Sequence, residues 1–215
     1  MTSITVIGGT GYTGSHIIRE AAARGHQVTS LSRSLPAEQL PGVTYLAGSA
    51  TDPDALRRAV TGADAVFAAI SPRAGLGEDL LPLYADLADL AAASGARLGV
   101  VGGFSALRPA AGAPRFAEGD DVPPEFAEEA RVMAAVVDYL IDEAPENLDW
   151  FYASPAASYG AYAPGTPTGT YRTGGDVALF DDDGESAISG PDFALALVDE
   201  VDKPRHHRTQ FGVTS

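Results

Sequence analysis

The sequence predicts an α/β protein built on a doubly wound parallel sheet, with helices on both faces. Short apolar segments alternate with amphipathic ones at intervals of roughly 25–30 residues, which is typical of strands that alternate with helices. Residues 65–70 include no polar side chain, as expected for a strand that is buried on both faces. A glycine-rich turn joins the first strand to the first helix. Units of this kind form one parallel sheet with right-handed crossovers.

The N-terminal half, residues 1–105, is expected to contain five strands and three helices. The helices end at glycines, because glycine readily adopts the left-handed conformation found at a helix C-terminus. Asp52 is the predicted N-cap of the second helix, and Pro53 suits its first position. We expect strands at residues 4–7, 27–31, 43–47, 65–70 and 98–101, and helices at 12–24, 53–61 and 78–93.

The C-terminal half, residues 106–215, is less regular, and we expect it to complete a single domain that spans residues 1–215. Segments rich in Pro and Gly predict surface loops, and Ser189 suits the N-cap of a closing helix. The predicted architecture therefore adds a small substrate-side hairpin and helix to the sheet. We expect loops at 107–124 and 154–169, helices at 125–141 and 191–201, strands at 148–152, 170–172, 177–180 and 211–213, and a turn at 181–184.

The composition limits the possible partners. Twenty-nine acidic residues against 14 basic ones give a formal charge of −15, which argues against binding to nucleic acids or anionic membranes. The chain has no Cys, and His206 and His207 lie in an expected solvated tail without a third ligand, so no metal site is predicted. No leader or membrane-spanning run is recognisable. We expect a soluble cytoplasmic monomer or homodimer that acts on a small molecule and binds neither nucleic acid nor membrane.

The glycine-rich turn has the spacing G-x-x-G-x-x-G, directly after the first strand and at the start of the first helix. The first glycine permits a tight turn, the second lets the backbone approach a pyrophosphate, and the third lets helix and strand pack closely. The N–H groups of the first helical turn then face the phosphates. The turn therefore predicts dinucleotide binding through Gly8, Thr10, Gly11, Tyr12, Thr13 and Gly14.

The residues after the second strand indicate which dinucleotide binds. An NAD site usually has an acidic residue there for the ribose 2′-hydroxyl, but none occurs between Glu20 and Glu38. Ser32, Arg33 and Ser34 occupy this position instead. A guanidinium can pair with a 2′-phosphate, and the hydroxyls can add hydrogen bonds. The sequence therefore favours NADP(H) over NAD(H).

Several segments together resemble a known family. GGTGYTG, LSRS, GVTYLAGSATDPDAL and ADAVFAAIS, followed later by LDWFYASPAA and the closing segment, are similar to the atypical short-chain dehydrogenase/reductase superfamily. Within it, the chain most resembles the NmrA-like and NADH-flavin reductase group, which is related to biliverdin-IXβ reductase. The resemblance implies a Rossmann-type fold and further cofactor contacts at Ala69, Ile70, Ser71, Gly102, Gly103, Phe104, Ser154 and Pro155. Gly48–Ser49 departs from the Gly-Asp common in the family, which puts an adenine contact there in doubt.

One feature of ordinary short-chain dehydrogenases is missing. None of the eight Tyr residues has Lys at the fourth following position, so no Tyr–Lys pair can supply a proton. We therefore expect an NADPH-dependent reductase of a small conjugated acceptor, such as a flavin or quinone, which needs no strong protein acid. Alternatives are an NmrA-like NADP(H)-binding redox sensor without turnover, or an epimerase or dehydratase of a small metabolite. Candidate catalytic residues are Ser105 and Tyr159; Tyr162 could join Tyr159 in a lid, and Tyr152 suits the core.

Overall fold

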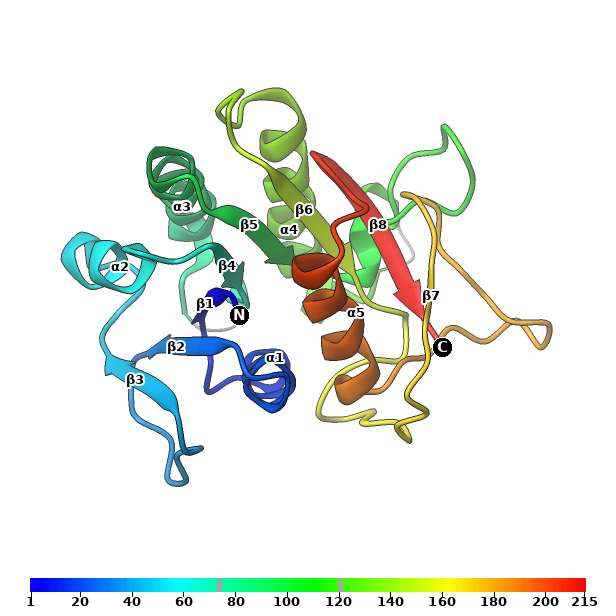
Figure 1. Cartoon of the computed structure of the whole chain (residues 1–215). Coiled ribbons are helices and arrows are strands. Elements are labelled where there is room, and N and C mark those ends of the chain that lie inside the picture. The colour runs from blue at the N-terminus through cyan, green and yellow to red at the C-terminus, as the bar shows by residue number, and fades with distance from the viewer. Residues whose placement is uncertain (73–74, 120–121) are drawn as a thin grey trace.

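The computed structural model describes residues 1–72, 75–119 and 122–215, and it is built around an eight-stranded sheet (Figure 1). The strand order is β3-β2-β1-β4-β5-β6-β8-β7. Strand β7 runs antiparallel to β8, and the other neighbouring pairs are parallel. The strands are β1 (Ser3–Ile7), β2 (Gln27–Ser32), β3 (Val43–Ala47), β4 (Ala65–Ala68), β5 (Arg97–Val101), β6 (Trp150–Ser154), β7 (Arg172–Thr173) and β8 (Thr209–Thr214).

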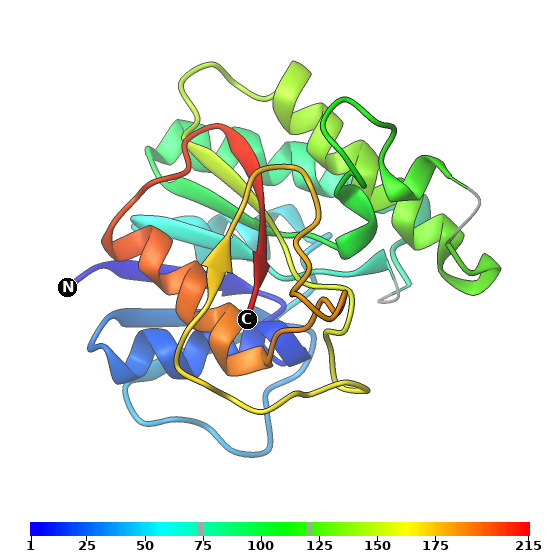
Figure 2. The same ribbon diagram turned by 90° about the vertical axis from the view of Figure 1, so that its right-hand side faces the viewer.

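Helices cover both faces of the sheet. Helices α1 and α5 cover one face, and α2, α3 and α4 cover the other (Figure 1, Figure 2). The chain starts near the middle of the sheet, winds outward to β3 and then returns to build the other side from β4. This arrangement confirms the predicted doubly wound α/β fold of the Rossmann type. The helices are α1 (Tyr12–Ala23), α2 (Pro53–Val60), α3 (Leu80–Ser94), α4 (Pro124–Asp142) and α5 (Gly190–Asp202).

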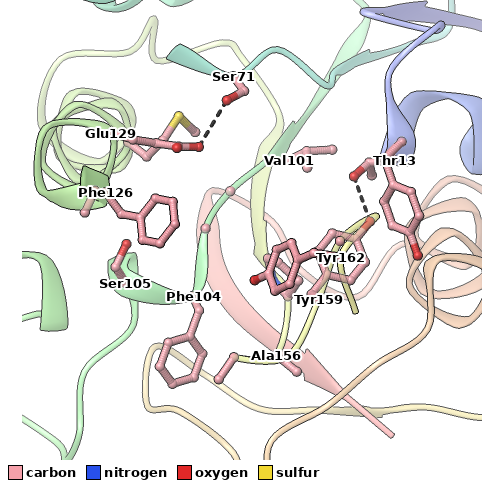
Figure 3. Close-up of a pocket in the computed structure, with 18 of the residues that line it drawn as sticks. Thr13, Ser71, Val101, Phe104, Ser105, Phe126, Glu129, Ala156, Tyr159 and Tyr162 are labelled. Atoms are coloured by element: carbon pink, nitrogen blue, oxygen red, sulfur yellow. Dashed lines mark hydrogen bonds between the residues drawn. The ribbon is translucent and has the colours of Figure 1, made fainter. Parts of the chain in front are cut away.

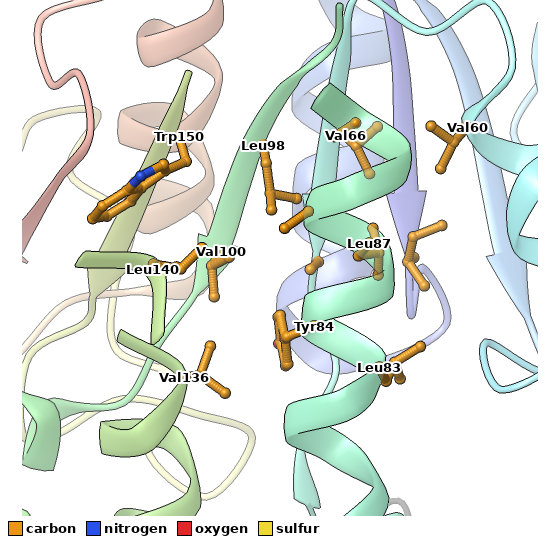
Figure 4. Packing of buried hydrophobic residues seen from close by; sticks show 14 of the residues in the cluster. Val60, Val66, Leu83, Tyr84, Leu87, Leu98, Val100, Val136, Leu140 and Trp150 are labelled. Atoms are coloured by element: carbon orange, nitrogen blue, oxygen red, sulfur yellow. The ribbon is translucent and has the colours of Figure 1, made fainter. Parts of the chain in front are cut away.

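One hydrophobic core lies between the sheet and the layer formed by α2, α3 and α4 (Figure 4). Helix α3 contributes Leu83, Tyr84 and Leu87, whose spacing puts all three on the face that packs against the core. Tyr84 is fully buried, and its hydroxyl donates a hydrogen bond of 3.1 Å to the Ile70 carbonyl. This bond satisfies the polar atom that the side chain carries into the core. Trp150 of β6 packs in the same cluster.

The second core joins α1 and α5, and α5 approaches α1 closely at a glycine. A Cβ at Gly190 would lie 2.5 Å from Cδ2 of His16 and 2.7 Å from Oη of Tyr12. As predicted, Ser189 caps α5, because its Oγ accepts a hydrogen bond of 3.1 Å from the Asp192 N–H. The start of α5 and the loop before it therefore lie beside the start of α1, at one edge of the sheet.

The predicted strand at 177–180 is wrong. Only Val177 makes an isolated bridge, to Arg108, because the backbone on either side of it bonds to the loop after β5. Strand β7 pairs with β8 instead, so the antiparallel edge joins segments separated by α5 and is not a local hairpin.

Other predicted boundaries move by a few residues. The strand expected at 148–152 starts at Trp150, since the Leu148 N–H closes a turn with the Pro145 carbonyl. The strand expected at 65–70 ends at Ala68, and α3 starts at Leu80 after one 3-10 turn. Residues 120–121 of the expected loop at 107–124 lie outside the described residues. Within the described ranges, no helix combines the length and apolar character needed to cross a bilayer.

A buried ion cluster ties α5 to the amino ends of the strands. Arg97, at the start of β5, donates hydrogen bonds to the backbone carbonyls of Glu200 and His206. The Nδ1 atom of His206 lies 2.7 Å from Oε1 of Glu200, and the His206 ring stacks on Phe211, so His206 does not belong to a solvated tail. Burial alone would raise the pKa of Glu200. Hydrogen bonds from His206 and from the backbone N–H groups of Arg205 and His206 outweigh burial and lower this pKa to about 2.

We expect Glu200→Gln to lower the free energy of unfolding by about 2 kcal/mol at neutral pH, because buried Arg97 then keeps only one of its two carboxylate partners, Asp149, and His206 loses the Glu200 carboxylate. The pKa of Glu200 is lower in the folded chain than its ordinary value of 4.5, so its stabilisation is present above pH 4.5 and is lost as the pH falls towards 2. Urea denaturation across this window measures the effect, with exposed Glu146→Gln as the control. A difference between wild type and variant that stays constant across the window would contradict the assignment.

Candidate functional site

A cavity of about 650 Å³ lies at the carboxyl ends of the central strands (Figure 3). Its walls come from the turn between β1 and α1, the segments after β4 and β5, the first turns of α4 and the loop after β6. In a sheet wound in two directions, loops from both halves diverge at this edge, and ligands bind in the crevice between them. The cavity is therefore the candidate site.

The glycine turn passes too close to its neighbours to carry side chains at three of its positions, and at Gly8 and Gly14 the neighbour is backbone. Gly8 has a φ of +88°, and a Cβ there would lie 2.3 Å from the Ala69 carbonyl oxygen. A Cβ at Gly14 would lie 2.3 Å from the Gly8 carbonyl oxygen. The N-cap of α1 is Gly11, which has no capping side chain, so the first N–H groups of the helix are available to an anionic ligand.

The turn is anchored to the end of β2. The Thr10 N–H donates a hydrogen bond of 3.1 Å to Oγ of Ser32, and Ser32 is buried. Arg33 and Ser34 follow immediately and are exposed. The segment predicted to select the nucleotide therefore lies beside the phosphate turn, but outside the main cavity.

The cavity brings together most of the residues singled out in the sequence. Those that line it are Gly11, Tyr12, Thr13, Ala69, Ile70, Ser71, Gly102, Gly103, Phe104, Ser105, Pro155 and Tyr159. Gly8, Thr10 and Gly14 belong to the glycine turn but do not line the cavity. Ser154 does not line the cavity: it is fully buried, and its Oγ accepts a hydrogen bond of 3.1 Å from Gln210.

Tyr159 links the loop after β6 to the glycine turn. Its hydroxyl lies 2.7 Å from Oγ1 of Thr13 (Figure 3). Its ring meets the rings of Tyr12 and Phe193 edge to face. Burial raises the pKa of Tyr159, so its hydroxyl stays protonated at neutral pH. Tyr162, from the same loop, is 76% exposed at the rim. Tyr152 is core, as predicted: it is fully buried, and its hydroxyl donates to the Met133 carbonyl.

The sequence prediction missed the contribution of α4. Phe126, Glu129, Ala130 and Met133 line the cavity from one face of this helix. The sequence predicts a helix at 125–141 but assigns no site residue to it. Ser71 lies shortly after β4, and its Oγ donates a hydrogen bond of 3.0 Å to Oε1 of Glu129 on α4. This bond fixes the orientation of the Glu129 carboxylate.

Aromatic rings give the cavity its chemical character. Phe104 stacks on Phe116 with ring centroids 5.0 Å apart, and both line the cavity. Phe126, although 42% exposed, projects from α4 into the same space opposite Tyr159 and Tyr162 (Figure 3). A cavity lined mainly by apolar and aromatic groups, with few polar ones, suits a planar conjugated ring.

Comparisons with known proteins agree with this geometry. A family model described as NAD(P)H-binding matches residues 8–204. Protein YwnB of Bacillus subtilis, which is uncharacterised, is 31% identical over 99% of this chain and 98% of its own length. Two solved structures are each 30% identical. A "putative epimerase" from Bacteroides thetaiotaomicron has a TM-score of 0.87 and covers 99% of this chain and 96% of its own. A "putative NADH-flavin reductase" from Streptococcus pneumoniae has a TM-score of 0.82 and covers all of both chains.

The wall of the cavity after β5 generates a stability prediction. A Cβ at Gly102 would lie 2.0 Å from Cε1 of Tyr152, whereas the nearest atom to a Cβ at Gly103 is Oγ of Ser105, 3.8 Å away. We expect Gly102→Ala to destabilise the fold by about 2 kcal/mol, because the buried Tyr152 ring must shift. Gly103→Ala, one residue later, should cost under about 0.5 kcal/mol. Thermal denaturation compares the two variants, and equal melting temperatures would refute the contact.

Proposed function

We propose that this chain, which belongs to the NAD(P)H-binding family, is an NADPH-dependent reductase that transfers hydride to a small conjugated acceptor such as a flavin or quinone. The observation that carries the proposal is the cavity itself. One wall is a phosphate-type glycine turn, and the remaining space is lined mainly by apolar and aromatic side chains. The similarity to a structure named as a "putative NADH-flavin reductase" over the full chain supports the same reaction class.

The residues present fit a nicotinamide dinucleotide. At Gly8 and Gly14, neighbouring backbone lies too close for any side chain. The turn therefore exposes bare backbone that a pyrophosphate can approach. The uncapped N-terminus of α1 offers N–H groups and the positive end of the helix dipole. Arg33, beside the end of β2, is suited to a 2′-phosphate. These features support NADP(H) as the preferred coenzyme.

When bound, the reduced nicotinamide supplies the hydride, and the chain binds, orients and shields it. Gly102, Gly103 and Ser105 follow β5, where the reactive ring is expected. Ser105 is the candidate for a hydrogen bond to a carbonyl oxygen of the ring or of the acceptor. The Tyr159 hydroxyl is hydrogen-bonded to Thr13 in the glycine turn. Tyr159 is therefore suited to positioning the coenzyme as well as to the catalytic role expected for it.

No strong acid is required for this reaction. The α4 residues that line the cavity are Phe126, Glu129, Ala130 and Met133. The described part of this wall therefore contributes neither a Tyr nor a Lys. Flavins and quinones spread the incoming charge over a conjugated ring and take their proton from water. A carbonyl-reducing or epimerising mechanism that depends on a Tyr–Lys pair is therefore disfavoured.

Turnover tests the proposal. We expect NADPH absorbance to fall faster with the protein and a flavin or quinone than without the protein. Ser105→Ala should lower kcat about tenfold through a lost hydrogen bond, with little change in the Kd for NADP⁺. Ser94→Ala, on α3, is the control. Tight coenzyme binding without consumption of any acceptor would favour the sensor alternative.

Coenzyme preference gives a separate prediction. Arg33→Ala should raise the Kd for NADP⁺ about tenfold or more and leave the Kd for NAD⁺ unchanged, because only the 2′-phosphate engages the guanidinium. Isothermal calorimetry measures both constants. Exposed Arg58→Ala, on α2, controls for the loss of a surface charge. If both coenzymes weaken equally, Arg33 does not select the phosphate.

A further inference from the structure

Arg115 is a buried cation that does not line the cavity. It lies in the loop between β5 and α4, and the residue is 3% exposed. Its Nη1 donates hydrogen bonds of 2.5 Å to the Ala106 carbonyl and 2.6 Å to Oε1 of Gln210. Its Nη2 donates one of 3.0 Å to Oδ1 of Asp138. These acceptors belong to the segment after β5, to β8 and to α4, so one guanidinium joins three separate parts of the fold.

Gln210 extends the same network to β6. Its Nε2 donates hydrogen bonds of 3.0 Å to the Ala106 carbonyl and 3.1 Å to Oγ of Ser154. The Ala106 carbonyl therefore accepts from Arg115 and from Gln210 at once. Side-chain hydrogen bonds thus hold together the ends of β5, β6 and β8, which are neighbouring strands, at the edge of the sheet where the cavity lies.

The residues next to this network form the wall of the cavity after β5. Phe104 and Ser105 directly precede Ala106, and both line the cavity (Figure 3). Phe116 directly follows Arg115, lines the cavity as well, and stacks on Phe104. The two segments of this wall are therefore joined twice, by the two stacked rings on the cavity side and by the guanidinium on the buried side.

The guanidinium is better suited to fixing this wall than to adding stability. Burying a cation costs free energy, and the side chain of Asp138 is 54% exposed, so water screens their ion pair and the pair offsets only part of that cost. What the guanidinium supplies is direction, because its planar fork holds several N–H donors at fixed angles. A lysine ammonium would supply the same charge without the fork.

We propose that Arg115 is a positioning residue, which acts through Phe104 and Ser105 to hold the acceptor against the reactive ring of the coenzyme. A misplacement of about 1 Å in a positioning group costs up to about a hundredfold in rate, so a wall that is free to shift is a slow one. The inference rests on the proposed function in one respect, because the acceptor must bind against the wall after β5. The glycine turn is held by β2 and by the end of β4 instead, so coenzyme affinity should not depend on Arg115.

Steady-state kinetics with NADPH and a flavin or quinone test the proposal. Arg115→Ala should lower kcat/KM for the acceptor about tenfold or more, and change the Kd for NADP⁺ by less than about twofold. Arg115→Lys keeps the charge but loses the fork, so it should lower kcat/KM at least about threefold. Glu200→Gln weakens the fold from the opposite edge of the sheet. It is the matched control, and it should keep the wild-type kcat/KM at a temperature where both variants are folded.

Amide hydrogen exchange tests the positioning without turnover. The N–H of Ala106 bonds to the Gly103 carbonyl within the wall, and it should exchange at least about tenfold faster in Arg115→Ala than in Glu200→Gln. The N–H of Gly8, in the glycine turn, should exchange at the same rate in both variants. Comparing two destabilised variants separates a local loosening of the wall from global unfolding.

Two results would overturn the inference: wild-type kcat/KM in either Arg115 variant, or the same exchange rate at Ala106 in the Arg115 variant and in Glu200→Gln. If Arg115→Ala does not fold, Arg115→Lys carries both comparisons. If the wild type reduces no flavin or quinone, the reductase function fails, and exchange at Ala106 still decides whether Arg115 holds the wall. If the wild type reduces an acceptor and Arg115→Ala does so equally well, only the role of Arg115 fails.

Discussion

The site depends on the close approach of the glycine turn to the end of β4. The Gly8 backbone lies so near the Ala69 carbonyl that no side chain fits between them, and Gly14 packs against Gly8 in the same way. These contacts fix the direction of α1, so that its first N–H groups face the cavity at the carboxyl edge of the sheet. Residues after β4, β5 and β6 can then meet around one volume. A side chain at either glycine would displace α1 and move the residues that line the cavity apart.

Stability and function are separated along the strands. The amino edge of the sheet holds a dense ion cluster in which Arg97, Glu200 and His206 satisfy one another and tie α5 to the sheet. The carboxyl edge instead holds a cavity with aromatic walls and a single carboxylate among its described lining residues. Because this cluster lies at the far edge, the ions that hold the end of α5 in place do not enter the cavity.

Local pattern predicted most of the fold and half of the site. Apolar periodicity and glycine stops located the strands and helices to within a few residues, and the turn from Gly8 to Gly14 located one wall of the cavity. Interactions between distant segments were not predictable in this way. Tyr159 and Thr13 are 146 residues apart, and Phe126 reaches the same cavity from the first turn of α4. Residues 177–180 had strand-like composition, but their backbone bonds to a loop.

The contact between Gly102 and Tyr152 has an evolutionary consequence. The two positions belong to adjacent strand ends, and the ring at 152 occupies the volume in which a side chain at 102 would begin. Position 102 therefore cannot take a side chain while the Tyr152 ring stays where it is. In descendants of this fold, a larger residue at 102 must be accompanied by a smaller one at 152. Such a paired replacement would move bulk from the interior into the chamber and reshape what that chamber admits, while the glycine turn stays untouched.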